Sequence, residues 1–358
     1  ELPKFLTARQ FRSFVNDHRE VMGPVADDWG LDVFRCAMRT LSFAGHAFVW
    51  EDPDHPASLI PASLALPWCA VAQQLGRPPV LSYASYALHN WRRLDPQKPT
   101  ELRNVVLLQN FLGGLDEEWF VLIHIDIEAK AGPGLVGLVQ AHNAARANKP
   151  DDVLQGLHAL AAAQEAMRET LLRMPERCDP YIYYSRVRPY IHGWKNSPSL
   201  PQGVVYEGVA DYAQRPQQFR GETGSQSSIV PALDAGLGIP HADDPLTQYL
   251  VEMRDYMPPR HRTFLAALEA RTDEQHRPLL YGYARDRKAT HPDLWKAFCT
   301  CVDLLAQFRD IHIGYAERYI FQQHQSHASN PTAVGTGGTP FMPYLSKHLE
   351  ETKRFTLD

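Results

Sequence analysis

The sequence predicts an all-α protein with a small N-terminal domain at 1–111 and a larger helical domain at 112–358. Apolar residues recur at helical spacing through long segments, most clearly at 294–321. Strand-like alternation is scarce, and the best candidate strand is the short string V-V-Y-E-G-V at 204–209. A chain of 358 residues is long enough to form two domains around sizeable cores.

The N-terminal domain reads as short helices interrupted by prolines. Asp27 or Asp28 is expected to cap a helix, Pro61 to open another, and Pro67 to kink or end that segment. Two amphipathic segments are marked by apolar residues at helical spacing: Phe11, Phe14 and Val15, then Leu31, Phe34 and Met38.

The larger domain is predicted to begin with a helix over 117–146, bent at Gly132-Pro133-Gly134. His124 lies inside this apolar run, where an ionisable group faces either a polar seam or a functional site. Asp151 or Asp152 is expected to cap the next helix. Further helices are predicted at about 179–191, 224–236, 245–256, 259–271, 274–288 and 292–321.

His312 shares one helical face with the apolar residues Cys301, Leu305, Tyr315 and Tyr319. A single histidine on such a face is more often a hydrogen-bonded core residue than a ligand. The alternative is that the imidazole holds haem iron from the proximal side. This helix alone does not decide between the two interpretations.

Two loops rich in glycine and hydroxyl residues lie at 221–228 and 335–339. Their glycines permit close backbone approach, but neither loop carries the lysine of a P-loop or follows a strand as in a dinucleotide fold. Each loop is therefore either a ligand-binding segment or a surface loop.

Composition excludes several classes of protein. The net charge is only −5 and no basic run occurs, which argues against nucleic-acid binding. No apolar run is long enough for a membrane span, and no signal-peptide core is present. The five cysteines are odd in number and scattered, which argues against a disulfide framework and favours a reducing cytoplasm. The protein is expected to be a monomer.

Six strings, in this order, resemble the indoleamine 2,3-dioxygenase family. They are N-W-R-R-L-D-P-Q-K-P at 90–99, G-W-K-N-S-P-S-L-P-Q-G-V-V-Y-E-G at 193–208, G-S-Q-S-S at 224–228, R-D-Y-M-P-P-R-H-R-T-F-L at 254–265, the His312 helix, and G-T-G-G-T at 335–339. The resemblance covers most of 90–350. It implies an all-α fold, haem b as cofactor, and a tryptophan-like substrate that reacts with dioxygen or peroxide, supported by an electron donor that the sequence does not identify.

The resemblance also assigns roles to residues around the haem. His312 matches the proximal iron ligand, Asp234 matches a carboxylate beside that ligand, and Arg309 matches an arginine that meets a haem propionate. A carboxylate near the ligand would raise the basicity of the imidazole. Ser225 and Gly337 fall in the loops that resemble the family's haem-contacting segments.

On the substrate side, Arg188 matches the family's arginine for the substrate carboxylate, a role that suits a guanidinium because it binds carboxylates bidentately. The G-T-G-G-T loop resembles the lid over the substrate, and Thr339 is expected to contact the substrate amino group. Gly224 is expected to lie beside the substrate.

Several positions depart from the family pattern. Tyr183 and Tyr184 replace two phenylalanines, His124 replaces a serine on the distal side, and Glu222 and Thr223 replace small residues. Each change adds proton-transfer capacity to a normally apolar site. The sequence also resembles an enzyme of pyrrolnitrin biosynthesis, and this resemblance, which the departures support, implies rearrangement and decarboxylation of 7-chlorotryptophan. The alternatives are ring dioxygenation of tryptophan to N-formylkynurenine and a haem sensor or carrier without turnover.

Overall fold

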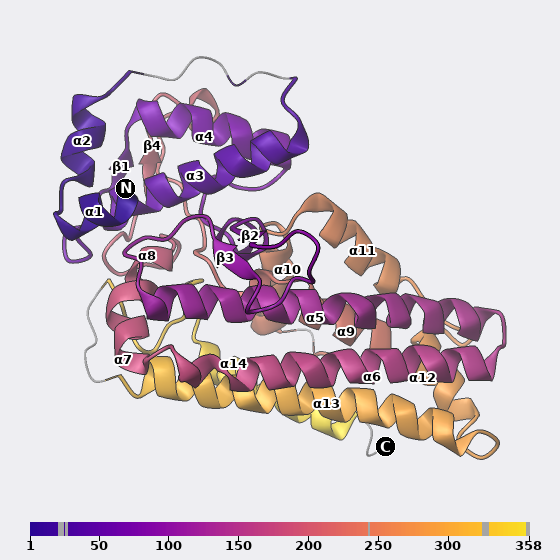
Figure 1. The fold of residues 1–358 in the computed structure, drawn as a ribbon. Coiled ribbons are helices and arrows are strands. Elements are labelled where there is room, and N and C mark those ends of the chain that lie inside the picture. The colour runs from indigo at the N-terminus through magenta and orange to yellow at the C-terminus, as the bar shows by residue number, and fades with distance from the viewer. Residues whose placement is uncertain (21–24, 26–27, 243, 324–328, 356–358) are drawn as a thin grey trace.

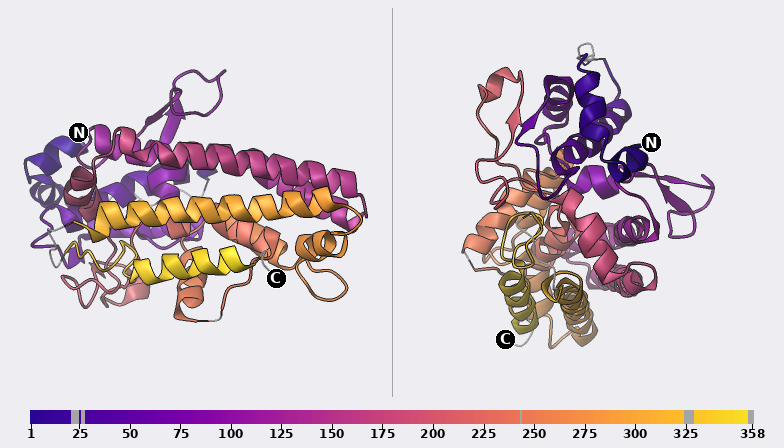
Figure 2. Two further views of the ribbon diagram at one scale, coloured as in Figure 1. Left: turned by 90° about the horizontal axis from the view of Figure 1, so that it is seen from below. Right: turned by 90° about the vertical axis from the view of Figure 1, so that its left-hand side faces the viewer.

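The computed structural model describes residues 1–20, 25, 28–242, 244–323 and 329–355. Three long helices form its centre: α5 (Leu115–Arg146), α6 (Pro150–Leu172) and α13 (Pro292–Ala316). They run side by side, and α6 contacts both of the others (Figures 1 and 2). This arrangement confirms the prediction of a mostly helical protein.

Helix α5 is not interrupted at Gly132-Pro133-Gly134, where a bend was expected; it continues as one helix to Arg146. Gly134 and Gly137 serve the packing of α5 on α6. A Cβ on Gly134 would lie 2.6 Å from Cβ of Ala163, and one on Gly137 would lie 2.8 Å from the carbonyl oxygen of Gly156. The two helix backbones therefore approach each other closely because side chains are absent at these positions.

The remaining helices of the larger domain correspond to the predicted segments, with changed ends. The prediction that Asp151 or Asp152 caps α6 is wrong, because both lie in its first turn behind Pro150. Helix α12 begins only at Leu279, since Asp273 accepts hydrogen bonds from the backbone and side chain of Arg277 and so forms a turn. Helix α14 (Phe341–Arg354) was not predicted. Besides α5, α6, α13 and α14, the larger domain contains α7 (Pro180–Ile182), η3 (Tyr183–Val187), α8 (Arg188–Ile191), η5 (Gly224–Gln226), α9 (Ile229–Leu237), α10 (Pro245–Arg254), α11 (Pro259–Glu269), α12 (Leu279–Asp286) and η6 (Glu317–Phe321).

The N-terminal segment forms a second group of helices, drawn in indigo above α5 in Figure 1. It comprises α1 (Leu2–Thr7), α2 (Phe11–Asp17), α3 (Leu31–Trp50), α4 (Ala62–Leu75) and η1 (Ala84–Leu88). The residue at the N-cap of α3 is Gly30, so Asp28 does not cap it; Asp27 lies outside the described residues. Pro61 is the N-cap of α4, and Pro67 does not end this helix, which runs on to Leu75.

Four short strands form two pairs. β1 (Leu59–Ile60) pairs in parallel with β4 (Val205–Tyr206), which lies within the predicted strand segment. β2 (Trp91–Arg93) pairs with β3 (Val105–Leu107) in an antiparallel hairpin. The first pair joins the N-terminal segment to the loop after α8. Among the described residues, no helix combines the length and the apolar character that crossing a membrane requires.

Candidate functional site

A cavity of about 220 Å³ lies between α5, α10, α13 and α14. Both glycine-rich loops, at 223–225 and 335–339, contribute to its wall, so two segments more than a hundred residues apart in the sequence meet at one site. Aromatic rings supply much of the remaining lining: Phe120, Tyr183, Tyr249, Tyr315, Tyr319, Phe341 and Tyr344. Such a lining suits a flat, mostly apolar ligand.

His312 lines this cavity from α13. Its side chain is solvent-accessible because it faces the cavity, and it makes no hydrogen bond to the described residues. Loss of bulk water inside the cavity, together with the proximity of His124, lowers its pKa to about 4. The imidazole is therefore neutral at physiological pH, which is the form that binds metals. A neutral, unpartnered imidazole among aromatic walls fits a haem group.

His124 lines the same cavity from α5. Its Nδ1 lies 2.7 Å from the carbonyl oxygen of Phe120 and donates to it, which leaves Nε2 as the acceptor nitrogen. Burial lowers its pKa as well. The structure therefore brings the predicted distal histidine and the predicted iron ligand to one cavity.

The two predicted tyrosines are placed differently. Tyr183 lines the cavity, with its ring 4.7 Å from that of Phe120, and burial raises the pKa of its hydroxyl. Tyr184 is buried away from the cavity, and its hydroxyl donates to the carbonyl oxygen of Asn330 at 2.5 Å. Of the two, only Tyr183 stands where a ligand in the cavity could touch it.

Arg188 is fully buried, at 0% exposure, and does not line the cavity. Its guanidinium donates to the side chain of Asn330, to the carbonyl oxygen of Pro331 at 3.0 Å, and to that of Val334 at 2.5 Å. Burial lowers its pKa to about 10. Arg188 thus holds the segment that leads into the G-T-G-G-T loop, and no carboxylate of the described residues pairs with it.

Arg220, which the sequence analysis did not identify, fastens the loop itself. Its guanidinium donates to the carbonyl oxygen of Gly337 at 2.7 Å and pairs with Glu252 at 2.7 Å. Glu252 in turn pairs with Lys195 at 2.6 Å. In the sequence, Arg220 stands directly before the first glycine-rich loop. Only this position could have indicated that Arg220 contacts the site. The predicted loop residues Gly224, Ser225, Gly337 and Thr339 all line the cavity.

Glu222 is a buried carboxyl in the cavity wall. Burial raises its pKa to about 8, so the group is mainly protonated at neutral pH. No described residue bonds to its carboxyl oxygens, although its backbone carbonyl accepts from the hydroxyl of Thr336. The cavity thus contains a protonated acid beside two neutral histidines.

Asp234 and Arg309 lie together but outside the cavity wall. Nη2 of Arg309 lies 2.6 Å from Oδ2 of Asp234, and the same guanidinium donates to the hydroxyl of Thr352. Burial alone would raise the pKa of Asp234, but Arg309 and His241 lower it to about 2. The structure pairs the two residues with each other rather than with His312.

Comparisons with known proteins agree with this geometry. The profile described as Indoleamine 2,3-dioxygenase matches residues 2–355. Indoleamine 2,3-dioxygenase 1 of Rattus norvegicus is 34% identical, covering 90% of this chain and 80% of its own, and indoleamine 2,3-dioxygenase of Saccharomyces cerevisiae is 32% identical over 89% and 77%. A protein named Myoglobin from Haliotis madaka is 28% identical over 99% and 89%. The family uses haem, and the chain belongs to the indoleamine 2,3-dioxygenase family.

Proposed function

We propose that the protein is a haem b enzyme that inserts dioxygen into the indole ring of tryptophan and releases N-formylkynurenine. The observation that carries this proposal is the neutral, unpartnered imidazole of His312 in an aromatic cavity closed by two glycine-rich loops. The relatives named indoleamine 2,3-dioxygenase support the same reaction. In it the C2–C3 bond of the indole breaks, and both oxygen atoms of one O₂ molecule stay in the product.

The haem, when bound, supplies the activation of dioxygen, and the protein supplies binding and orientation. His312 would hold the iron through its neutral imidazole. The aromatic lining would exclude water and pack against the indole. Gly224, Ser225 and Gly337 let the backbone approach the ligands closely, since they are small residues at the cavity wall.

Arg188 is proposed to bind the substrate carboxylate. It is a buried cation whose present acceptors are all uncharged, namely Asn330 and the carbonyl groups of Pro331 and Val334. Once residues 330–334 move away and open Arg188 to the cavity, a carboxylate would accept two of its N–H groups bidentately and form stronger bonds than these carbonyls do. Thr339, in the cavity wall, is proposed to bind the amino group.

His124 is proposed to act on the distal side. Its Nε2 is an acceptor in the cavity because Nδ1 is occupied by the Phe120 carbonyl. An acceptor there suits the indole N–H, which must be held while the ring reacts. Glu222, protonated at neutral pH, adds a donor to the same wall.

Mass spectrometry of the product tests the proposal. Reduced, haem-loaded protein is given ¹⁸O₂ and tryptophan, and the expected product keeps its carboxylate and contains two ¹⁸O atoms. The His312→Ala protein should lose the haem absorption that a bound imidazole gives. If it kept a normal five-coordinate haem spectrum, the assignment of His312 would be wrong.

A second candidate is the oxidative rearrangement and decarboxylation of 7-chlorotryptophan to monodechloroaminopyrrolnitrin, in which CO₂ leaves and two electrons and two protons pass to dioxygen or peroxide. The observation in its favour is the number of proton-handling groups in the cavity: His124, Tyr183 and Glu222. Run alongside, 7-chlorotryptophan should then give a product that has lost CO₂ and retains no ¹⁸O from the gas. That result with no dioxygenation of tryptophan would replace the first proposal.

A third candidate is a haem protein without turnover, suggested by the relative named Myoglobin. The buried Arg188 argues against it, since a carrier of a small gas has no use for a carboxylate site. A tryptophan titration that left the Soret band of the haem-loaded protein unchanged would favour this candidate.

A further inference from the structure

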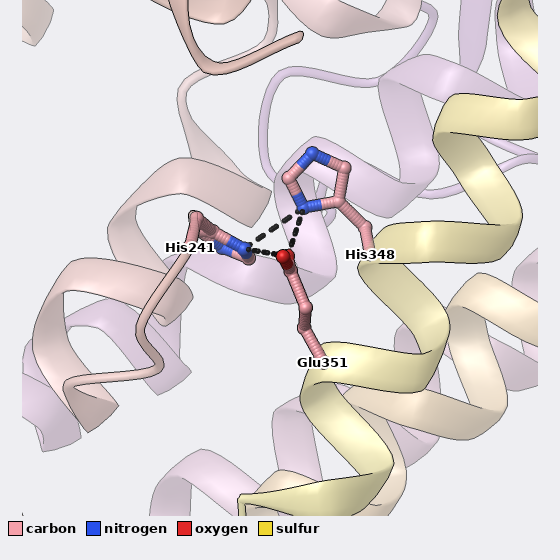
Figure 3. Close-up of side chains that lie close together, drawn as sticks. All are labelled: His241, His348 and Glu351. Carbon is pink, nitrogen blue, oxygen red and sulfur yellow. Dashed lines mark hydrogen bonds and ion pairs between the residues drawn. The ribbon is translucent and has the colours of Figure 1, made fainter. Parts of the chain in front are cut away.

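Two histidines and a glutamate form a compact cluster (Figure 3). One of them, His348, also lines the cavity proposed to bind haem. His241 follows α9, while His348 and Glu351 lie one turn apart on α14. Nδ1 of His241 lies 2.9 Å from Nδ1 of His348 and 2.7 Å from Oε2 of Glu351. Nδ1 of His348 lies 3.5 Å from the same oxygen.

We propose that His241, His348 and Glu351 bind a divalent transition-metal cation, with Zn²⁺ as the best fit. A zinc ion bonds imidazole nitrogen and carboxylate oxygen at about 2.0–2.2 Å, and tetrahedral geometry then separates neighbouring ligand atoms by about 3.3 Å. The three distances in the cluster, 2.9, 2.7 and 3.5 Å, lie around this value. The three atoms can therefore hold one ion with small movements, and the fourth position is left for water.

Asp234 lies close enough to one of the ligands to pair with it. Its Oδ2 lies 3.2 Å from Nε2 of His241, on the side of the ring opposite the cluster. Histidines that bind zinc usually give their second N–H to a carboxylate, which fixes the tautomer and raises the basicity of the ligating nitrogen. A proton on Nε2 leaves the lone pair of His241 Nδ1 for the cation.

Burial and charge also suit a cation. His348 is 8% exposed, and its Nε2 has no partner among the described residues, so its Nδ1 can serve as a neutral ligand. Two cationic side chains lie nearby: Arg309 pairs with Asp234, and Lys347 pairs with Asp244 and, at 3.7 Å, with Oε1 of Glu351, which leaves Oε2 of Glu351 for the cation. Imidazole with carboxylate is a donor set that zinc and its neighbours prefer over Mg²⁺ or Ca²⁺.

The position of the site indicates what the cation would do. Helix α14 begins at Phe341, directly after the G-T-G-G-T loop, and His348 also lines the cavity proposed to bind haem. A cation held by two residues of α14 and by His241 would fasten this helix to the segment after α9. The proposed ion thus has a structural role, because it would stabilise the part of the chain that carries the loop. This role does not depend on which reaction the haem performs.

Metal analysis of the haem-loaded protein tests this inference. Zinc and iron are counted separately after dialysis against Zn²⁺, and affinity is measured by competition with a chromogenic chelator. We expect about one zinc per chain in addition to the haem iron, and a rise in Tm on zinc addition because the ion binds the folded state. Glu351→Gln and His348→Gln should each weaken binding about tenfold or more, and Asp234→Asn about 10- to 100-fold.

Glu350→Gln is the matched control, since Glu350 is an exposed carboxylate next to Glu351 on the same helix. It should bind zinc as the unchanged protein does. Haem absorption and circular dichroism report whether each variant is folded. If His348→Gln does not fold, Glu351→Gln decides the outcome, because glutamine has nearly the same shape as glutamate. Absence of zinc from the unchanged protein, or equal zinc in Glu351→Gln and Glu350→Gln, would overturn the proposal.

Discussion

At the scale of single residues, Arg188 has an unusual combination of properties. It is a fully buried cation held only by uncharged acceptors from the segment before the G-T-G-G-T loop. Lysine would keep the charge but lose the planar fork that serves several acceptors at once. We therefore expect Arg188→Lys to raise KM for tryptophan about 10- to 100-fold, because hydrogen bonds to charged groups contribute about 1.5–3 kcal/mol.

Steady-state kinetics of haem-saturated protein measure this effect. Arg186→Lys is the control, because Arg186 is exposed on the same short helical segment and should keep the KM of the unchanged protein. The haem spectrum of Arg188→Lys should also be unchanged, since Arg188 does not line the cavity. An unaltered KM in Arg188→Lys would remove the carboxylate role from this residue.

Local pattern and family resemblance indicated some of the residues on the cavity wall, among them His124, His312 and the two glycine-rich loops. His312 lies on a helical face that the spacing alone predicts, and it does line the cavity. Arg220 could not be found in this way, because its contact with Gly337 depends on how two distant loops meet. The distal role expected of Tyr184 is not matched by its position, since its hydroxyl is turned to Asn330.

At the scale of the helices, the pair α5 and α6 depends on glycine. Adding a methyl group at Gly137 would place Cβ 2.8 Å from the carbonyl oxygen of Gly156 and 2.9 Å from Cβ of Ala159. Alanine gains up to about 1 kcal/mol of helix propensity, but overpacking a tight core costs about 1–3 kcal/mol. We expect Gly137→Ala to lower the free energy of unfolding by about 1–2 kcal/mol, measured by urea denaturation.

Gly314→Ala provides the comparison. Gly314 lies in α13, and a Cβ there would meet nothing within 4 Å. This variant should be as stable as the unchanged protein or up to about 1 kcal/mol more stable. A Gly137→Ala protein that also gained stability would show that α5 and α6 can separate without cost.

The elements themselves were predictable where periodicity is long and unbroken. Helices α5, α6 and α13 follow from apolar spacing over more than twenty residues each. The pairing of β1 with β4 was not predictable, because it joins segments about 145 residues apart in a chain with few strand signals. Pro67 was expected to kink or end α4, but the helix continues to Leu75. Trp68, the next residue, is buried in the core against Gly45, and this tertiary packing stabilises the helix beyond the proline.

At the scale of the whole molecule, buried histidines connect separate parts of the chain. His46 on α3 donates from Nδ1 to the carbonyl oxygen of Tyr190 at 2.8 Å, and its Nε2 accepts the N–H of Leu81 at 2.9 Å. Burial lowers its pKa to about 3. The bond to Tyr190 links the N-terminal helices to α8. Protonation of Nε2 would break the bond from Leu81, which packs with Tyr190 in the same hydrophobic cluster. The division at residue 111 stays a prediction.

Several groups of this kind should set the pH dependence of stability. Burial lowers the pKa of His46, His89, His142 and His192, two of them to about 3 and His142 to about 4. Burial raises the pKa of Glu117 to about 7 and of Glu222 to about 8. Below pH 6.5 the histidines bind protons in the unfolded chain but stay neutral in the native protein. The free energy of unfolding therefore falls as the pH falls. Between about pH 6.5 and 8 the native carboxyls hold protons that the unfolded chain has released, so stability falls as the pH rises.

The free energy of unfolding should therefore be highest near pH 6.5 and decrease on both sides, by about 1–3 kcal/mol per pH unit on the acid side, where the histidines outnumber the carboxyls. Urea denaturation of the haem-loaded protein from pH 5 to pH 8.5 measures this profile. His142→Gln, which can still donate to the Gly236 carbonyl, should make the acid side less steep, and Glu222→Gln should flatten the alkaline side. His158→Gln, at an exposed position, should leave both sides unchanged. A stability that rises steadily toward pH 5 would mean that the native histidines do accept protons, and that their burial is not maintained in solution.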